Sequence, residues 1–245
     1  MKESLEKSRR LAFIGEMSAG LAHEIRNPLA AIGGSIQMLR GDFKRNETNA
    51  RLMQIILRGK EQLESFLKDF LLMARPAPGI REVLDIRETI REVMESLRCI
   101  ADWHERLDVV VTLADESLNI RANKMEIRQV IWNLILNAVQ AMPEAGVLKV
   151  EGYPARSGER DGVEINIGDT GFGIREQDFQ KIFEPFYTTR ETGTGLGLAV
   201  VSRIIEVYGG KIHLQSECGK GTVFTIWIPV SDSAEVGVVS QEEGG

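Results

Sequence analysis

The sequence predicts an α+β protein in which an N-terminal helical hairpin precedes an α/β sandwich. Three observations support this prediction. Residues 8–75 contain a single proline, and their apolar side chains recur every three or four positions. Beyond residue 79, valine-rich segments of strand length alternate with amphipathic segments of helical period. Between the two halves stands Arg75-Pro76-Ala77-Pro78-Gly79, which indicates a linker because proline cannot continue a helix and glycine relaxes the backbone.

The hairpin is predicted from two apolar stripes, at residues 11–39 and 52–73, which a polar stretch at 41–48 separates. Heptad-like spacing over several turns favours two long helices joined by a short loop. An antiparallel pair with one apolar seam cannot bury that seam well alone. Two copies related by a two-fold axis would bury it in a four-helix bundle, so we expect a homodimer. The alternative is packing of the hairpin against the second half of the chain.

The second half has the pattern of a mostly antiparallel sheet with helices on one face. We expect helices at Asp85–Leu97, Lys124–Met142, Arg175–Phe183 and Leu196–Val207, and strands at Leu107–Leu113, Val147–Tyr153, Val163–Ile167, Lys211–Ser216 and Thr222–Pro229. The predicted domain organisation is a hairpin at residues 1–75, a linker at 76–82, the α/β domain at 83–230 and a disordered acidic tail at 231–245.

Composition excludes several classes of function. The formal charge of −6 argues against a nucleic-acid partner, which requires a basic surface. Cys99 and Cys218 form no CxxC pattern, so reduced thiols are favoured over a metal site or a disulfide. No apolar stretch approaches the roughly 20 residues that span a bilayer. We therefore expect a cytoplasmic chain without membrane contact of its own, while a membrane anchor in a longer parent protein stays open.

His23 is the first candidate for chemistry. Beside the apolar stripe of Leu21 and Ile25, helical spacing points it away from the seam. Glu24 can bond one ring nitrogen and leave the other as a nucleophile. Pro28 removes the hydrogen bond to the carbonyl of Glu24 and should bend the helix nearby. The alternative interpretation is an ordinary solvated histidine on a helix.

Two clusters in the second half suit a nucleotide. Asn133 and Asn137 share one side of a predicted helix, where they could offer an oxygen to Mg²⁺ and an amide to a phosphate oxygen. The segment 169–173, with sequence DTGFG, follows a predicted strand. Its acid could accept a hydrogen bond from an exocyclic amine while Gly171 and Gly173 admit a flat ring. Surface asparagines and an ordinary strand-to-helix turn are the alternatives.

Two more clusters lie further along the chain, at residues 183–190 (FEPFYTTR) and 193–198 (GTGLGL). The second opens a predicted helix, whose backbone N–H groups could hold phosphates. Its GxGxG spacing differs from the GxGxxG dinucleotide fingerprint, and no strand directly precedes it, so a Rossmann fold is excluded. The polar stretch 187–194 is typical of a lid over a nucleotide.

Taken in order, these segments resemble the histidine kinase family over residues 10–229. Residues 23–29 resemble its H box, 133–138 its N box, 169–173 its first glycine box, 183–186 its F box and 193–197 its second glycine box. The resemblance implies a dimerisation and phosphotransfer hairpin followed by a Bergerat-type (GHKL) ATP-binding domain. The H box and lid look most similar to the nitrogen-regulation class, although Arg190 stands where lysine is commoner.

The resemblance also implies roles for individual residues. His23 would be the phosphoacceptor, Glu24 its general base, and Asn27 the residue that orients water for dephosphorylation of a partner. Asn137 would bind Mg²⁺. The residues implied to bind ATP are Asn133, Asn137, Asp169, Gly171, Gly173, Phe183, Thr188, Thr189, Arg190, Gly193, Thr194, Gly195, Leu196 and Gly197. Phosphate would pass from His23 to an aspartate in a response regulator receiver domain.

Two other functions are alternatives to this one. The first is a different ATPase of the same nucleotide fold, of the gyrase, chaperone or mismatch-repair type. The hairpin that carries His23 argues against it, because those proteins have no use for it. The second is a silent dimeric scaffold that binds nucleotide without phosphotransfer. The presence of His23, Glu24, Asn137 and Asp169 together argues against that scaffold.

Overall fold

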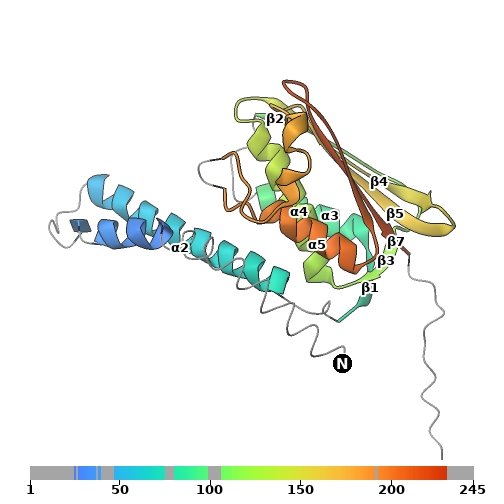
Figure 1. Ribbon diagram of the computed structural model, residues 1–245, viewed down its shortest axis with the longest axis horizontal. Helices are drawn as coiled ribbons and strands as arrows, with labels where there is room; N and C mark the ends of the chain where they lie inside the picture. The colour runs from blue at the N-terminus through green and yellow to red at the C-terminus, as the bar shows by residue number, and fades with distance from the viewer. Residues whose placement is uncertain are drawn as a thin grey trace, which may run out of the picture. The chain divides into compact units, whose positions relative to one another are not determined.

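The computed structural model describes residues 25, 27–36, 38–39, 47–74, 80–98, 106–190 and 193–230. The chain divides into two compact units, one of residues 1–78 with 174–204 and the other of 79–173 with 205–245. The described part of the first unit consists of helices, 3₁₀ turns and loops, and a mixed α/β arrangement makes up the second (Figure 1). The predicted α+β class is therefore confirmed.

The first unit contains the predicted helical hairpin. Residues 27–36 are helical, and α2 (Glu47–Ala74) lies beside them (Figure 1). The absence of a side chain at Gly59 permits close contact, since a Cβ there would lie 2.9 Å from Cγ1 of Ile32. Phe66, about two turns further along α2, contacts Ile25. As residue numbers rise on one helix they fall on the other, so the two helices are antiparallel.

The second unit contains a five-stranded sheet in the order β2-β4-β5-β7-β6. Its strands are β2 (Leu107–Leu113), β4 (Gly146–Ser157), β5 (Arg160–Asp169), β6 (Lys211–Glu217) and β7 (Gly221–Pro229). Three of the four pairings are antiparallel, and β2 runs parallel to β4. The prediction of a mostly antiparallel sheet is confirmed.

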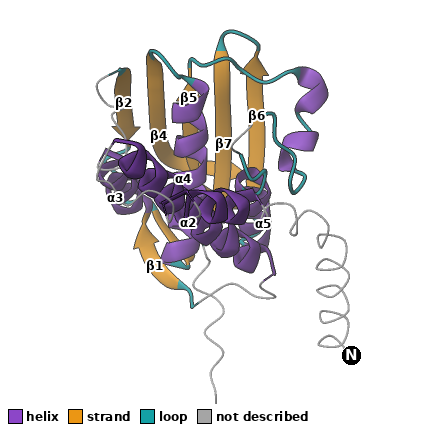
Figure 2. Ribbon diagram, turned by 90° about the vertical axis from the view of Figure 1, so that its left-hand side faces the viewer, coloured by secondary structure: helices purple, strands orange, loops and turns teal. Residues whose placement is uncertain are grey.

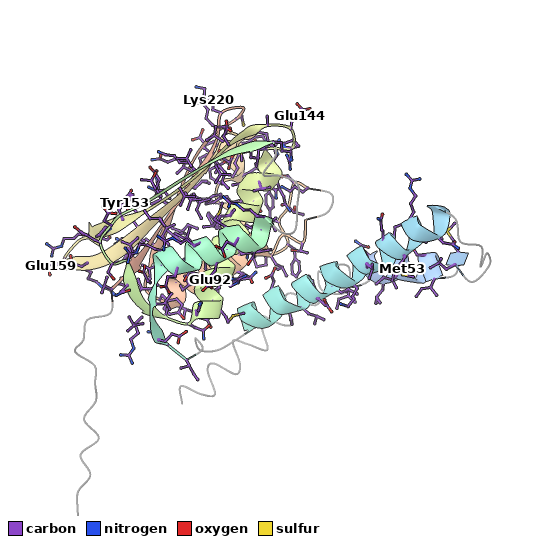
Figure 3. The ribbon with its side chains drawn as sticks, turned by 180° about the vertical axis from the view of Figure 1, so that it is seen from behind. Met53, Glu92, Glu144, Tyr153, Glu159 and Lys220 are labelled. Carbon is purple, nitrogen blue, oxygen red and sulfur yellow. The ribbon has the colours of Figure 1, made fainter. Side chains whose placement is uncertain are left out.

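Helices cover one face of this sheet. Figure 2 shows α4 (Lys124–Ala141) in front of the strands, and α3 (Ile86–Arg98) packs against α4. An ion pair of 2.7 Å between Nζ of Lys124 and Glu92 joins the two helices. Leu148 and Ile165 on the inner face of the sheet are fully buried, whereas Tyr153 lies on the opposite, solvent-facing side (Figure 3). Alternation along each strand thus places the core between the sheet and α4.

Two features differ from the predictions. A second, two-stranded antiparallel sheet pairs β1 (Glu82–Asp85) with β3 (Asn119–Ala122), and neither strand was predicted. Four residues are too few to show a period of two, and the partner is distant in sequence. The single helix predicted at Arg175–Phe183 is instead two 3₁₀ turns, η2 (Glu176–Asp178) and η3 (Lys181–Phe183). So short a segment gains little from helical cooperativity, and contacts of its side chains set the backbone.

Within the described ranges, no helix combines the length and the apolar composition that crossing a bilayer demands.

Candidate functional site

The helix α4 positions both predicted N-box asparagines. Asn123 caps it, because Oδ1 of Asn123 accepts hydrogen bonds from the backbone N–H groups of Met125 and Glu126 at 3.0 and 3.2 Å. The helix ends at Ala141, just before Pro143. Asn133 and Asn137 lie one turn apart in its second half, on the same side, as predicted.

A column of buried polar side chains runs along α4. Glu126, Gln129 and Asn133 are only 4, 6 and 7% exposed, and the other buried residues of the helix are apolar. Nε2 of Gln129 donates to Oδ1 of Asn133 at 3.1 Å, and the hydroxyl of Tyr208 donates to Oε2 of Glu126 at 2.7 Å. Sequence reasoning missed Glu126, Gln129 and Tyr208. The available signal was the spacing of three polar residues at i, i+3 and i+7, which places them on one face of the predicted helix.

Tyr208 anchors the beginning of this column. Its oxygen accepts a hydrogen bond from the backbone N–H of Asn123 at 2.9 Å, and the guanidinium of Arg81 lies 5.0 Å from the centre of its ring. Burial, together with the hydrogen bond to Glu126, raises the pKa of Tyr208 to about 12. The tyrosine thus stays neutral and ties the capped start of α4 to the segment that follows α5 (Gly197–Val207).

The first glycine segment is held against the other end of α4. Asp169, the last residue of β5, is 9% exposed, and one of its carboxylate oxygens accepts the N–H of Gly171 at 2.8 Å. The N–H of Phe172 donates to the carbonyl of Ala141 at 3.2 Å. A Cβ on Gly171 would stand 2.4 Å from that carbonyl oxygen, so only glycine permits this approach. The structure therefore brings Asp169 and Gly171 to the helix end that carries Asn137.

The turn between β6 and β7 closes around the same segment. The N–H of Gly219 donates to the carbonyl of Phe172 at 2.9 Å, and Gly173 lies against the backbone of Glu217. Gly221 has a φ of +113°, and a Cβ there would lie 1.9 Å from the carbonyl oxygen of Asp169. Gly221 fixes the position of Asp169, and the sequence carried no signal for it beyond a glycine in a turn.

Figure 3 locates this end of the sheet. Glu144, which follows α4, and Lys220, in the β6–β7 turn, lie at one end of the strands. Glu159, in the turn between β4 and β5, lies at the opposite end. Asp169 belongs to the first end, because it is the last residue of β5 and pairs with Thr222 beside the β6–β7 turn.

The remaining predicted residues belong to the first unit. Phe183 ends η3, and a clamp on Tyr187 follows it. The hydroxyl of Tyr187 donates to Asp178 at 2.8 Å, and Nε of Arg175 donates to the other carboxylate oxygen at 2.8 Å. These bonds, that of Tyr187 first, hold the pKa of Asp178 below its usual value. The clamp fixes the start of the stretch that was predicted to be a lid.

The lid stretch is a loop with a closed base. The N–H of Phe186 donates to the carbonyl of Gly195 at 3.0 Å, and Phe186 has a φ of +66°. Leu196, which is fully buried, forms a cluster with Phe66 against which Phe186 packs. Within the loop, Thr188, Thr189, Arg190, Gly193 and Thr194 are described, and Gly197 begins α5. Oγ1 of Thr188 accepts the N–H of Arg190 at 3.1 Å.

Of the predicted catalytic residues, Asn27 is described, and it is exposed on the first helix of the hairpin. His23 and Glu24 lie outside the described residues.

Two family models match this chain. The His Kinase A (phospho-acceptor) domain matches residues 13–79, and the histidine kinase-, DNA gyrase B- and HSP90-like ATPase matches residues 122–232. The first match contains the H-box segment. The second contains the α4 column, the glycine segment at Asp169 and the loop.

Curated relatives cover nearly the whole chain. Sporulation kinase E of Bacillus subtilis is 36% identical over 96% of this chain, and sensor histidine kinase ZraS of Escherichia coli K12 is 33% identical over 94%. The chain spans 31% and 49% of the length of these two proteins.

Solved structures extend the likeness to the fold. A complex of histidine kinase ThkA with response regulator protein TrrA has a chain that is 31% identical, with a TM-score of 0.75 over 94% of this chain and 66% of that one. The catalytic domain of ThkA is 32% identical, with a TM-score of 0.53 over 61% of this chain and 95% of that domain. The chain therefore belongs to the family of two-component sensor histidine kinases.

Proposed function

We propose that this chain is an ATP-dependent protein-histidine kinase core that phosphorylates its own His23 and passes the phosphoryl group to an aspartate of a response regulator. One observation carries the proposal. The end of α4 that bears Asn137 also holds Asp169 and Gly171, and this arrangement lies in one matched domain while His23 lies in the other. The two domains supply a nucleotide site and a phosphoacceptor.

The residues present fit an adenine nucleotide. Asp169 ends a strand with its carboxylate oriented by the N–H of Gly171, so it can accept a hydrogen bond from an exocyclic amine. Gly171 presents bare backbone, which allows a flat ring to approach. The asparagines on α4 would bind the phosphate end of the nucleotide. The nucleotide-binding roles of Thr188, Thr189, Arg190 and residues 193–197, which belong to the first unit, stay predictions.

A divalent cation fits the same donors. Among the described residues, no group of three or more His, Cys, Asp or Glu side chains is placed to hold a metal ion. Mg²⁺ is commonly bound by few protein ligands together with substrate phosphates, and an amide oxygen is one of the oxygen donors it accepts. Asn137, which is half-buried, would supply that oxygen. Bound there, the ion would neutralise charge on the phosphates.

Residues of the hairpin would carry out the phosphoryl transfer. Nε2 or Nδ1 of His23 would attack the terminal phosphorus of ATP, forming an N–P bond as the bond to the bridging oxygen breaks and ADP leaves. Glu24 would hydrogen-bond the N–H of the other ring nitrogen and accept its proton as the N–P bond forms. Catalysis then depends mostly on positioning and on charge neutralisation. Asn27, one turn after His23, would orient water during dephosphorylation of the regulator.

The partners follow from the same comparison. ThkA was solved in complex with the response regulator protein TrrA, and its likeness to this chain supports a receiver domain as the partner here. The apolar seam of the hairpin and the phospho-acceptor domain match support a homodimer. Membership of the nitrogen-regulation class stays a prediction.

The test is incubation of the chain with γ-labelled ATP and Mg²⁺, followed by treatment of the labelled protein with acid and base. We expect label that acid removes and base does not, present in His213→Gln and absent from His23→Gln. His213 is the matched control, because it is exposed on the edge strand β6. ATP binding without label would leave a nucleotide-binding ATPase or a silent scaffold. Label that persists in His23→Gln would identify a different acceptor.

A further inference from the structure

One hydrogen bond on α4 has no part in the chemistry proposed above. Nε2 of Gln129 donates to Oδ1 of Asn133 at 3.1 Å, and both side chains are buried. The residues are four apart, so they are neighbours on one face of the helix. The bond therefore restrains the amide of Asn133 at its oxygen.

The direction of that bond determines what Asn133 can offer to a ligand. An asparagine amide has an acceptor end and a donor end, which point in different directions. Gln129 engages the acceptor end, so the NH₂ group is directed elsewhere. A phosphate oxygen is an anionic acceptor and binds donors. In the reverse orientation, the carbonyl oxygen of Asn133 would face the phosphate and repel it.

We propose that Gln129 is a positioning residue that fixes the Asn133 amide with its NH₂ group toward the nucleotide phosphates. This inference rests on the proposed function, which puts the phosphates beside Asn133. Gln129 itself would not touch the nucleotide. It would act only through the orientation of its neighbour.

The surroundings of Gln129 support this role. Burying polar side chains is unfavourable unless they are hydrogen-bonded. Glu126, Gln129 and Asn133 nonetheless form a buried column, and Tyr208 holds its far end at Glu126. At 6% exposure, Gln129 has little access to solvent that could replace a lost bond. The orientation of Asn133 should therefore depend on what stands at position 129.

The experiment compares MgATP with adenosine as ligands of the full chain, by titration calorimetry. Gln129→Glu replaces the donor by an acceptor, so the Asn133 amide should turn to donate to it and present its oxygen to the phosphates. We expect the Kd for MgATP to rise about tenfold or more, the equivalent of one hydrogen bond. The Kd for adenosine, which lacks phosphates, should stay unchanged. Gln140→Glu, the same change at an exposed position of α4, should alter neither value.

Two further variants separate positioning from general damage. Gln129→Met removes the donor without adding an acceptor, and it should weaken MgATP binding less than Gln129→Glu does. If Gln129→Glu does not fold, Gln129→Met carries the comparison of the two ligands. In an Asn133→Ala background, Gln129→Glu should have no further effect on the Kd for MgATP, because the residue through which Gln129 acts is gone.

Three results would overturn the inference: an unchanged Kd for MgATP in Gln129→Glu and Gln129→Met, an equal loss for MgATP and adenosine, or full additivity with Asn133→Ala. Failure of the proposed function looks different. A wild-type chain that binds MgATP but leaves His23 unlabelled contradicts the kinase proposal alone. A wild-type chain that does not bind MgATP contradicts both.

Discussion

Replacing Tyr208 by phenylalanine should destabilise the second unit by more than most surface changes do. The ring is 7% exposed, and phenylalanine can keep its packing. The hydroxyl is lost, and with it the donor to Glu126 at 2.7 Å and the acceptor of the Asn123 N–H at 2.9 Å. Because Glu126 is buried, water cannot readily replace the donor. The variant leaves the buried carboxylate of Glu126 and the partly buried N–H of Asn123 without this partner.

The magnitude follows from those two bonds. A hydrogen bond to a carboxylate contributes about 1.5–3 kcal/mol, and a neutral one about 1 kcal/mol. We expect the free energy of unfolding to fall by about 3 kcal/mol in Tyr208→Phe. For a chain of this size, that loss corresponds to a decrease in Tm of roughly 6–12 °C. Urea unfolding and thermal unfolding both measure it.

Tyr153→Phe is the matched control. The hydroxyl of Tyr153 also bonds a carboxylate, that of Glu164, and accepts from Asn166, but it lies on the solvent-facing side of the sheet (Figure 3). Solvent can satisfy these groups after the substitution, so the cost should stay within about 1 kcal/mol. Equal losses in the two variants would refute the argument that burial makes the Tyr208 network important.

The pH dependence provides a second test of Tyr208. Its pKa is raised to about 12 in the folded chain, above the value of about 10 for an unfolded tyrosine. The stabilisation is therefore fully present below pH 10 and is lost as pH rises through 12. The difference in unfolding free energy between wild type and Tyr208→Phe should shrink between pH 10 and 12. A difference that is constant across this range would contradict the assigned cause.

Two other substitutions give sharp expectations. Asp178→Asn weakens the clamp on Tyr187. Because the pKa of Asp178 is lowered from 3.8 in the folded chain, its carboxylate stabilises the fold above that pH, and this stabilisation is lost as pH falls below it. Urea unfolding should therefore separate Asp178→Asn from wild type at pH 7, and the gap should narrow progressively as pH falls below 3.8. A gap that stays constant in acid would contradict this reasoning. Gly221→Ala should cost about 2 kcal/mol more than Gly219→Ala, because both glycines have positive φ but only a Cβ at position 221 meets the backbone of Asp169. Equal losses of unfolding free energy in the two variants would contradict this prediction, because the backbone would then accommodate a Cβ at position 221.

Local signals predicted most of the elements. The helix expected at Lys124–Met142 is found at Lys124–Ala141, because its cap at Asn123 and the stop at Pro143 are both adjacent in sequence. The strand expected at Leu107–Leu113 has the same bounds in the structure. In both, the signals lie within the segment or directly beside it, so no distant contact is needed to define it.

These local signals could not predict which distant strands pair with each other. The strand β2 runs parallel to β4, and the chain between them includes α4, the kind of crossover that a parallel pair requires. The strands β1 and β3 pair across more than thirty residues, by an alignment of 82 with 122. Neither arrangement has a local pattern of its own, because the stabilisation comes from hydrogen bonds that form only once the helices have packed.

The candidate site shows the same division between local and distant information. Asn137, Asp169 and Gly171 were predicted because each stands in a short motif with a chemical meaning. Gly221 and Gln129 were not, since Gly221 matters through a backbone fifty-two residues earlier and Gln129 through a side chain one turn away. The role of such a residue becomes apparent only from its contacts in the folded structure.

The helix α4 links the Tyr208 network at its start to the candidate nucleotide site at its end. Its first turn is held by Asn123 and Tyr208, and the carbonyl of Ala141 in its last turn receives the N–H of Phe172 beside Asp169. The column between them connects the two ends through buried side chains, so a loose start of the helix should also loosen the site. Tyr208→Phe should therefore weaken MgATP binding in proportion to its loss of stability, whereas Tyr153→Phe should leave it unchanged. If Tyr208→Phe lost stability but bound MgATP as wild type does, the start of α4 would not be coupled to the nucleotide site at its other end.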